Sequence, residues 1–175
     1  MLDSLISSKT RIKLLLRFFL NPNHKAYLRG LASDFGESTN AVRLELNKME
    51  KAGLIEGESQ GNRKMFKANN QHPLFEEIRN IVMKHLGLDQ LLVQIVHKLG
   101  DVKKVYLTGD LAKGIDTDMV DVALVGGVDT SYLVKLVTTA ESVLQRKIRY
   151  VVFSEEEAEK RDWDDNEYLV LWEQE

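Results

Sequence analysis

Residues 105–126 read VYLTGDLAKGIDTDMVDVALVG, and this stretch constrains the fold more than any other part of the chain. A short apolar strand over 103–108 runs into a glycine turn, and a second apolar strand follows over 119–125. A glycine turn behind a strand can surround a phosphate with backbone N–H groups, and two Asp at alternate positions of the next strand can hold Mg²⁺. The segment therefore predicts a small sheet with the outline of a nucleotide site.

The carboxylates of this segment do not form the required pair. The second strand carries Asp121 alone, and Asp118, three residues earlier, would point to the opposite face because side chains alternate along a strand. In another register Asp116 and Asp118 have the required spacing of two, provided that the strand begins earlier and Asp121 finds a partner within its apolar run. We expect the first register, without a metal site, and keep the second as an alternative.

These residues resemble the minimal nucleotidyltransferase domain. Its pattern is Gly-Ser, a few residues, Gly, and then Asp-x-Asp on a strand, with a third acidic residue on a later strand. Gly109, Gly114 and Asp121 match this pattern. Asp110, however, stands at the serine position and Met119 at the first Asp, so an anion replaces the triphosphate-binding hydroxyl.

A third strand is expected over 147–153, and it carries Arg149 or Arg146 where the third carboxylate would lie. The resemblance covers about residues 88–160 and implies a nucleotidyltransferase-like fold. We expect no transferase activity, no catalytic residue, no metal and no cofactor. The alternative is an active Mg²⁺-dependent nucleotidyltransferase that uses Asp116 with Asp118, or Asp121. The remnant of the nucleotide site comprises Gly109, Asp110, Gly114, Asp116, Asp118 and Asp121.

Charge divides the chain into two parts. Residues 1–72 carry 12 Lys and Arg against 7 Asp and Glu, a net charge of +5, whereas residues 73–175 carry 12 against 20, a net charge of −8. A basic part suits a polyanionic partner, and an acidic part would be repelled by the same partner. We therefore expect only the first part to contact nucleic acid.

The composition excludes several classes of protein. The chain has no cysteine, which excludes a disulfide framework and thiolate metal sites, and no long apolar run predicts a membrane span. The first residues, MLDSLISSKTRIK, lack the basic start, apolar core and cleavage site of a secretory signal. We expect a cytoplasmic protein that does not enter a membrane.

Helical periodicity predicts three helices in the basic part. Apolar residues recur at helical spacing over 8–19 and again over 28–35, where Gly36 suits the left-handed position that closes a helix. Ser38 is the expected N-cap of a third helix, and Gly53 its stop. The buried stripe of the third helix is Val42, Leu46 and Met49. Leu44 lies away from this stripe, so it packs on the second helix or faces a partner chain.

Two strand-like runs follow over 54–59 and 64–68. They are joined by Gln60-Gly61-Asn62-Arg63, whose Gly-Asn pair suits a tight hairpin. Three helices and a basic hairpin in this order resemble a winged helix-turn-helix of the ArsR-like transcriptional regulators, and KMEKAGLIEGESQGNRKMFKAN resembles the end of that family's recognition helix and its wing. The match covers residues 8 to about 72.

The resemblance implies that the third helix enters the major groove of double-stranded DNA while the hairpin tip reaches the backbone or the minor groove. Polar residues of that helix fall in one sector away from its buried stripe. The alternative is a protein-binding module that contacts no nucleic acid. The expected groove contacts are Ser38, Thr39, Asn40, Arg43 and Asn47, and the expected wing contacts are Asn62, Arg63 and Lys64.

The remaining pattern predicts a helical connector and a small α/β domain. A helix begins near Pro73, a second amphipathic helix closes at Gly100, and a crossover helix over 133–144 leads to the third strand. Residues 154–157 have capping-box spacing and begin one more helix. The tail EYLVLWEQE is expected to dock as a strand or a helix, and both tryptophans to pack rather than bind a ligand.

The predicted class is therefore α+β, with an N-terminal winged helix-turn-helix followed by a small α/β nucleotidyltransferase-like domain with a mixed sheet. The expected divisions are residues 1–72, a connector over 73–100, and residues 101–175. The expected function is a DNA-binding transcriptional regulator whose second domain serves dimerisation or ligand sensing. Its expected partners are double-stranded DNA, a second copy of the chain and an unknown small-molecule effector.

Overall fold

The computed structural model describes residues 2–163 and 168–174, and the chain divides into two compact units. Unit 1 comprises Met1–His85 with Gly114–Asp116, and unit 2 comprises Leu86–Lys113 with Thr117–Glu175. The region expected as a connector, 73–100, is therefore shared between them. Among the described residues, no helix has the length and apolar character needed to cross a membrane.

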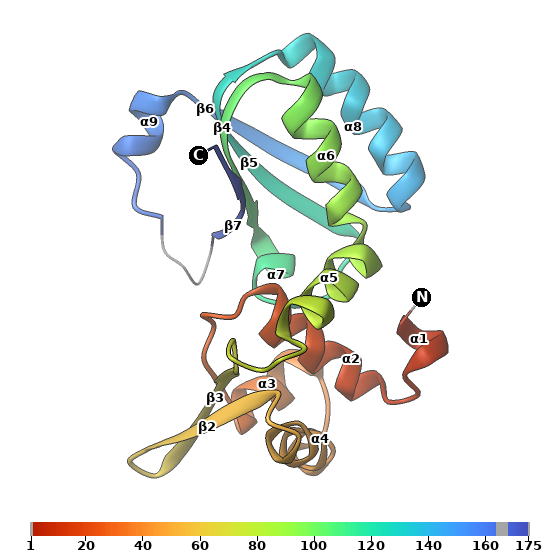
Figure 1. Cartoon of the computed structure of the whole chain (residues 1–175), viewed down its shortest axis with the longest axis vertical. Helices are drawn as coiled ribbons and strands as arrows, with labels where there is room; N and C mark the ends of the chain where they lie inside the picture. Colours follow the sequence, from red (N-terminus) through yellow and green to blue (C-terminus); the bar gives the residue numbers. More distant parts are fainter. Residues whose placement is uncertain (1, 164–167, 175) are drawn as a thin grey trace. The chain divides into compact units, whose positions relative to one another are not determined.

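Unit 1 combines short helices with a three-stranded antiparallel sheet (Figure 1). The strand order is β1-β3-β2. The first expected helix is observed as α2, which continues without a break into one π-helical segment. The elements are α1 (Leu2–Leu5), α2 (Lys9–Leu15), η1 (Leu16–Leu20), β1 (Ala26–Tyr27), α3 (Leu28–Phe35), α4 (Thr39–Lys51), β2 (Ile55–Gln60), β3 (Arg63–Ala68) and α5 (Phe75–Leu86).

The predicted turn between α3 and α4 is confirmed. Gly36 ends α3 with a φ of 63°, a left-handed conformation that glycine adopts without steric cost. The Ser38 hydroxyl accepts a hydrogen bond of 3.2 Å from the Ala41 N–H, which makes Ser38 the N-cap of α4. Lys13 donates a hydrogen bond of 2.6 Å to Glu37, and this contact ties α2 to the same turn.

The core of unit 1 lies between η1, α4 and the sheet. Phe18 and Phe19 are fully buried, as is the predicted α4 stripe of Val42, Leu46 and Met49. The Phe19 ring packs against the ring of Phe75 on α5, with centroids 5.5 Å apart. Helix α5 buries Phe75 and Val82, whereas Leu74, just before the helix, and Ile81 are exposed.

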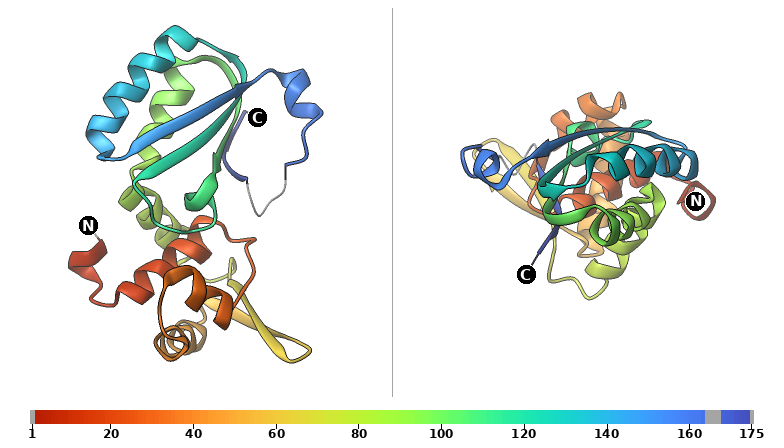
Figure 2. Two further views of the ribbon diagram at one scale, coloured as in Figure 1. Left: turned by 180° about the vertical axis from the view of Figure 1, so that it is seen from behind. Right: turned by 90° about the horizontal axis from the view of Figure 1, so that it is seen from above.

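Unit 2 is built on a four-stranded sheet in the order β6-β5-β4-β7 (Figure 2). Strands β5 and β6 are parallel, and the other neighbours are antiparallel. The predicted α+β class with a mixed sheet is thus confirmed. The elements are α6 (Leu88–Lys98), β4 (Gly100–Thr108), α7 (Gly109–Ala112), β5 (Met119–Val128), α8 (Thr130–Leu144), β6 (Lys147–Phe153), α9 (Glu155–Glu159) and β7 (Leu169–Glu173).

The two faces of this sheet are covered differently. Helices α6 and α8 lie on one face (Figure 1). On the other face Tyr106 stacks on Trp163 with ring centroids 4.2 Å apart, and Phe153 and Tyr168 meet Trp163 edge to face. Trp163 is therefore a packing residue, as expected. The C-terminal tail forms β7, which extends the sheet beside β4.

Candidate nucleic-acid interface

A two-residue turn joins β2 and β3 into the predicted hairpin. Gln60 pairs with Arg63, and the turn between them consists of Gly61 and Asn62. Gly61 has a φ of 59°, and a Cβ added there would meet no atom within 4 Å, so open space lies beside the turn at this glycine. The side chains of Asn62 and Arg63 are exposed at the tip.

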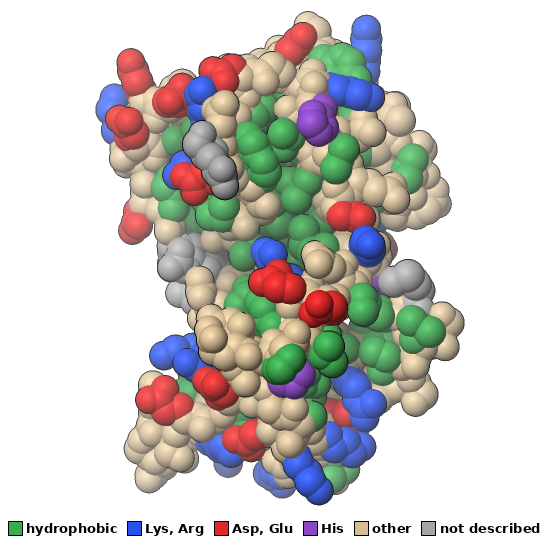
Figure 3. Space-filling model, viewed as in Figure 1, with side chains coloured by type: hydrophobic (Ala, Val, Ile, Leu, Met, Phe, Trp, Pro, Cys, Tyr) green, Lys and Arg blue, Asp and Glu red, His purple; other side chains and the backbone are tan. Residues whose placement is uncertain are grey.

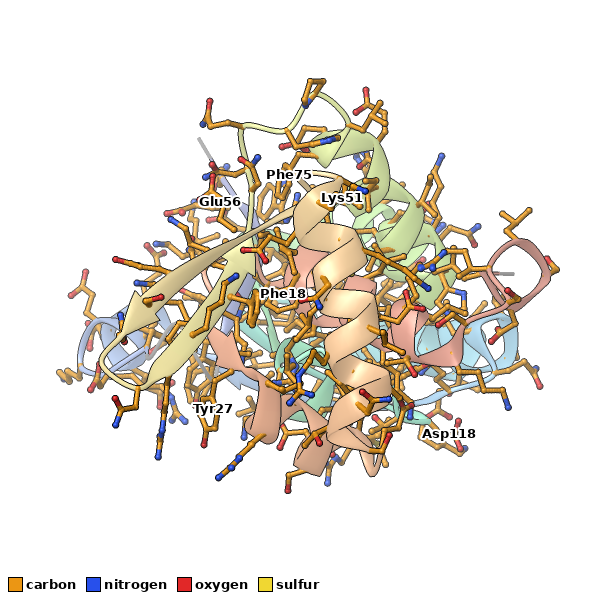
Figure 4. All side chains as sticks on the ribbon, turned by 90° about the horizontal axis from the view of Figure 1, so that it is seen from below. Phe18, Tyr27, Lys51, Glu56, Phe75 and Asp118 are labelled. Atoms are coloured by element: carbon orange, nitrogen blue, oxygen red, sulfur yellow. The ribbon has the colours of Figure 1, made fainter. Side chains whose placement is uncertain are left out.

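A groove of about 710 Å³ lies between α4, the start of α3 and this hairpin. Figure 4 shows α4 beside the hairpin, with Phe18 between them and Lys51 at the end of α4 away from Tyr27. None of the described residues that line the groove is acidic, and four are cationic. We call this feature the α4–hairpin groove. Its lining is Tyr27, Leu28, Arg29, Arg43, Leu46, Asn47, Asn62, Arg63, Lys64 and Phe66.

Arg63 is held against an aromatic ring at the edge of the groove. Its guanidinium carbon lies 5.1 Å from the ring centroid of Tyr27. The contact follows from the register: Tyr27 pairs with Met65, so Arg63, two residues along β3, lies diagonally on the same face. On the α3 side the ring packs over Gly30, where an added Cβ would lie 3.3 Å from it. Stacking of this kind orients a guanidinium while leaving its N–H groups able to donate.

The structure brings five of the eight predicted contact residues together in the α4–hairpin groove. Thr39, Asn40 and the capping Ser38 are exposed at the start of α4 but do not line the groove. Sequence reasoning missed Tyr27 and Arg29, which reach the groove because β1 joins the hairpin sheet. A two-residue strand has no periodic signal, and this is why its contribution was not predicted. The five residues are Arg43, Asn47, Asn62, Arg63 and Lys64.

The cations of the groove differ in their partners. Within the described chain Arg29 and Arg43 are exposed and form no ion pair, whereas Lys64 contacts Glu50 at 2.7 Å. Figure 3 shows Lys and Arg side chains gathered over unit 1 on the face drawn. Leu44 is exposed on α4, so it does not pack on α3. Arg63 also forms no ion pair among the described residues, so three arginines are available to donate to an external anion.

Of the two acidic residues of α4, Glu50 is bound by Lys64 and Glu45 is held by two cations of its own. Glu45 is only 8% exposed, and its carboxylate accepts from Arg11 at 2.8 Å and from Lys48 at 3.2 Å. Burial by itself would raise the pKa of this carboxyl, but the hydrogen bonds and charges of Arg11 and Lys48 outweigh it and hold the pKa below its ordinary value. Glu45 therefore ties α2 to α4 as a carboxylate.

Replacing Glu45 by Gln is expected to destabilise unit 1 by about 1 to 2 kcal/mol at neutral pH, because charge-assisted hydrogen bonds are lost. The folded-state pKa is lowered, so this stabilisation is present above the unfolded pKa and disappears as the pH falls through the folded one. Urea unfolding at pH 7 and pH 3, followed by circular dichroism, measures the difference. A difference that does not shrink between pH 7 and pH 3 would contradict the role of the carboxylate.

In the segment that resembles a nucleotide site, the carboxylate on strand β5 forms an ion pair within unit 2. Strand β5 begins at Met119, so Asp116 and Asp118 lie before it and the earlier strand start required by the alternative register is not observed. Asp121 pairs in register with Arg149 on β6. The Arg149 Nε and Nη2 atoms donate to the two carboxylate oxygens of Asp121 at 2.5 and 2.8 Å. This bond to Asp121 also raises the pKa of Arg149.

Gly109, directly after β4, lies close to the same Asp121 carboxylate. It has a φ of 68°, and an added Cβ would lie 2.5 Å from an Asp121 carboxylate oxygen. Asp110 is exposed beside it, in α7 rather than in an open glycine loop. Among the described residues no group of three His, Cys, Asp or Glu is placed to hold a metal ion. With its one strand carboxylate bound by a guanidinium, this donor set does not fit Mg²⁺.

Comparison with known proteins gives slight likenesses. No protein-family model and no curated protein matches the sequence. Among solved structures, the DNA-binding protein Sso10a-2 from Sulfolobus solfataricus is 13% identical, with a TM-score of 0.35 over 50% of this chain and 88% of its own. The transcriptional regulator BldR from the same organism is 13% identical, with a TM-score of 0.38 over 57% and 69%. A candidate nucleotidyltransferase from that organism is 21% identical, with a TM-score of 0.34 over 52% and 82%.

Proposed function

We propose that this chain is a DNA-binding transcriptional regulator. In this proposal unit 1 is a winged helix-turn-helix of the ArsR-like type, with α4 as the helix that enters the major groove and the β2–β3 hairpin as the wing. The observation that carries the proposal is the α4–hairpin groove, where the described lining residues include four cations and no acidic residue. A phosphate backbone is the polyanion that such a concave cationic surface suits.

The positions of the groove residues support a division of labour on DNA. Arg43 and Asn47 lie one turn apart on the exposed side of α4, and both side chains can donate to base edges in the major groove. Arg63, fixed over Tyr27, extends from the wing toward the backbone or the minor groove. The Glu50 carboxylate, which would repel a phosphate, is bound by Lys64.

Unit 2 is proposed to keep a nucleotidyltransferase-like fold without transferase activity. Two-metal phosphoryl chemistry needs carboxylates that are free to hold the ions. Asp121 instead binds Arg149, and Gly109 closes over the pair. In the proposal this unit holds two copies together or senses a small-molecule effector. Nucleotide turnover that depends on Mg²⁺ and is abolished by Asp121→Ala would overturn this part.

The test is binding of the purified full chain to a mixed-sequence DNA duplex at 50 and 200 mM salt. Because each phosphate contact releases counterions, the logarithm of the binding constant is expected to fall linearly with the logarithm of the salt concentration. A slope of about −3.5 to −4.5 would correspond to four or five phosphate contacts. Absence of binding at the lower salt would overturn the proposal and favour a protein-binding module.

A further inference from the structure

Strand β6 is the last strand of the unit 2 sheet, and no described strand covers its outer edge. The Lys147 N–H donates to the Asp118 carbonyl, toward β5, at 2.7 Å. The next N–H, of Ile148, points the other way and donates to the Glu141 carboxylate at 2.9 Å. Since backbone groups alternate along a strand, those of Tyr150, Val152 and Ser154 also point outward.

Side-chain caps close this outer edge at both ends and leave its middle open. Glu141 accepts from Ile148 at one end, and at the other Glu157 accepts a hydrogen bond of 2.9 Å from the Ser154 N–H. Between these two caps only Tyr150 and Val152 present outward backbone groups. The open window is therefore two hydrogen-bonding residues long and is centred on Val151.

The residues of the open window are suited to pairing with another strand. Tyr150 and Val151 are 41% and 43% exposed, and aromatic and β-branched residues of this kind favour strand pairing. Exposed edges are commonly blunted by proline, bulges or a covering element. Strand β6 has no proline, and its pairing with β5 runs without a bulge. The caps protect the ends alone.

Charge along the strand indicates what pairs with it. The start of β6 carries the exposed cations Lys147 and Arg149, which also pair with Glu141 and Asp121, and the strand is followed at once by the acidic first turn of α9. An antiparallel partner of identical sequence would bring the basic start of each strand to the acidic end of the other. A parallel partner would align like charges, which is unfavourable.

We propose that β6 pairs antiparallel with β6 of a second copy of this chain, about a two-fold axis at Val151. In this register Tyr150 of each copy exchanges two hydrogen bonds with Val152 of the other, and both side-chain caps stay in place. The basic start of each β6 then lies near the acidic first turn of the other copy's α9. The two four-stranded sheets become one continuous sheet, which is an isologous interface. The inference rests on the dimer role proposed for unit 2.

A cysteine at the two-fold axis tests this register. The chain has no cysteine of its own, so Val151→Cys would supply the only thiol. Residues facing each other at a position without backbone hydrogen bonds have Cα atoms about 4.5 Å apart, which suits a disulfide. Val170→Cys on β7, the opposite edge strand, is the matched control because Val170 is also 43% exposed.

Mild oxidation of Val151→Cys is expected to convert most of the chain to a disulfide-linked dimer on a non-reducing gel, while Val170→Cys runs there as a single chain. Light scattering of the unmodified chain across a dilution series is expected to show a dimer, and Val151→Asp, which places like charges on the axis, is expected to raise its dissociation constant about tenfold or more. A monomeric native chain, or equal cross-linking at both positions, would overturn the proposal. These measurements use no DNA, so their outcome is independent of whether unit 1 binds it.

Discussion

The Arg43→Ala, Arg63→Ala double variant is expected to bind mixed-sequence duplex DNA about 100-fold more weakly than the native chain at low salt. Each arginine is exposed, lines the α4–hairpin groove and has no ion-pair partner among the described residues. Loss of one arginine contact with a base or phosphate costs about 1 to 3 kcal/mol, or roughly tenfold or more. Fluorescence anisotropy of a labelled duplex measures the change.

A matched control is available on the same helix. Lys51 is exposed at the end of α4 but does not line the groove, so Lys51→Ala removes a charge from α4 without removing a groove contact. We expect this variant to lower affinity no more than about threefold, through the long-range field alone. Equal losses in the double variant and the control would mean that net charge, and not the groove, determines binding. The single Arg63→Ala change is expected to reduce the salt slope by about one.

Gly109→Ala is expected to destabilise unit 2 by about 3 kcal/mol. The φ of 68° disfavours a side chain there by about 1 kcal/mol or more. The added Cβ would also lie 2.5 Å from the Asp121 carboxylate, which Arg149 fixes in place, and such overpacking costs about 1 to 3 kcal/mol. Both tryptophans of the chain lie in unit 2, so urea unfolding followed by tryptophan fluorescence reports this unit specifically.

Gly127→Ala is the control in the same sheet. At Gly127 the nearest heavy atom would be 3.7 Å from an added Cβ, an ordinary contact, and the backbone is not left-handed. We expect its unfolding midpoint to stay close to that of the native chain. In the Gly109→Ala, Asp121→Ala double variant the clash is removed, so part of the stability should return. A Gly109→Ala protein as stable as Gly127→Ala would mean that the turn does not press on Asp121.

The sequence predicted elements wherever local signals were strong. Ser38 as a cap, Gly36 as a stop and the hairpin turn depend on short-range backbone chemistry, and all three were found where expected. The buried stripe of α4 followed from helical period alone. The lack of a carboxylate pair on the second strand also followed from alternation, because β5 begins at Met119.

Features that depend on distant partners were not predictable. Arg17 reads as a surface residue, yet it is 3% exposed and donates to Asp34 at 2.8 Å, seventeen positions along the chain. The sequence places Arg149 or Arg146 where a third carboxylate would lie, but the bond from Arg149 to Asp121 depends on the parallel register of β5 and β6. Tyr27 likewise gains its place beside Arg63 through the β1–β3 pairing.

The open turn at the hairpin tip determines which changes in the length of the β2–β3 hairpin the protein tolerates. Insertions at an exposed turn such as Gly61-Asn62, which has no neighbour around its glycine, are readily tolerated. Adding one residue to each strand at this turn would move the tip outward by about 3.3 Å and leave Arg63 beside Tyr27, because the spacing from Arg63 to Met65, the pairing partner of Tyr27, is unchanged. Descendants are therefore expected to lengthen this hairpin at its tip while they keep the contact between Arg63 and Tyr27.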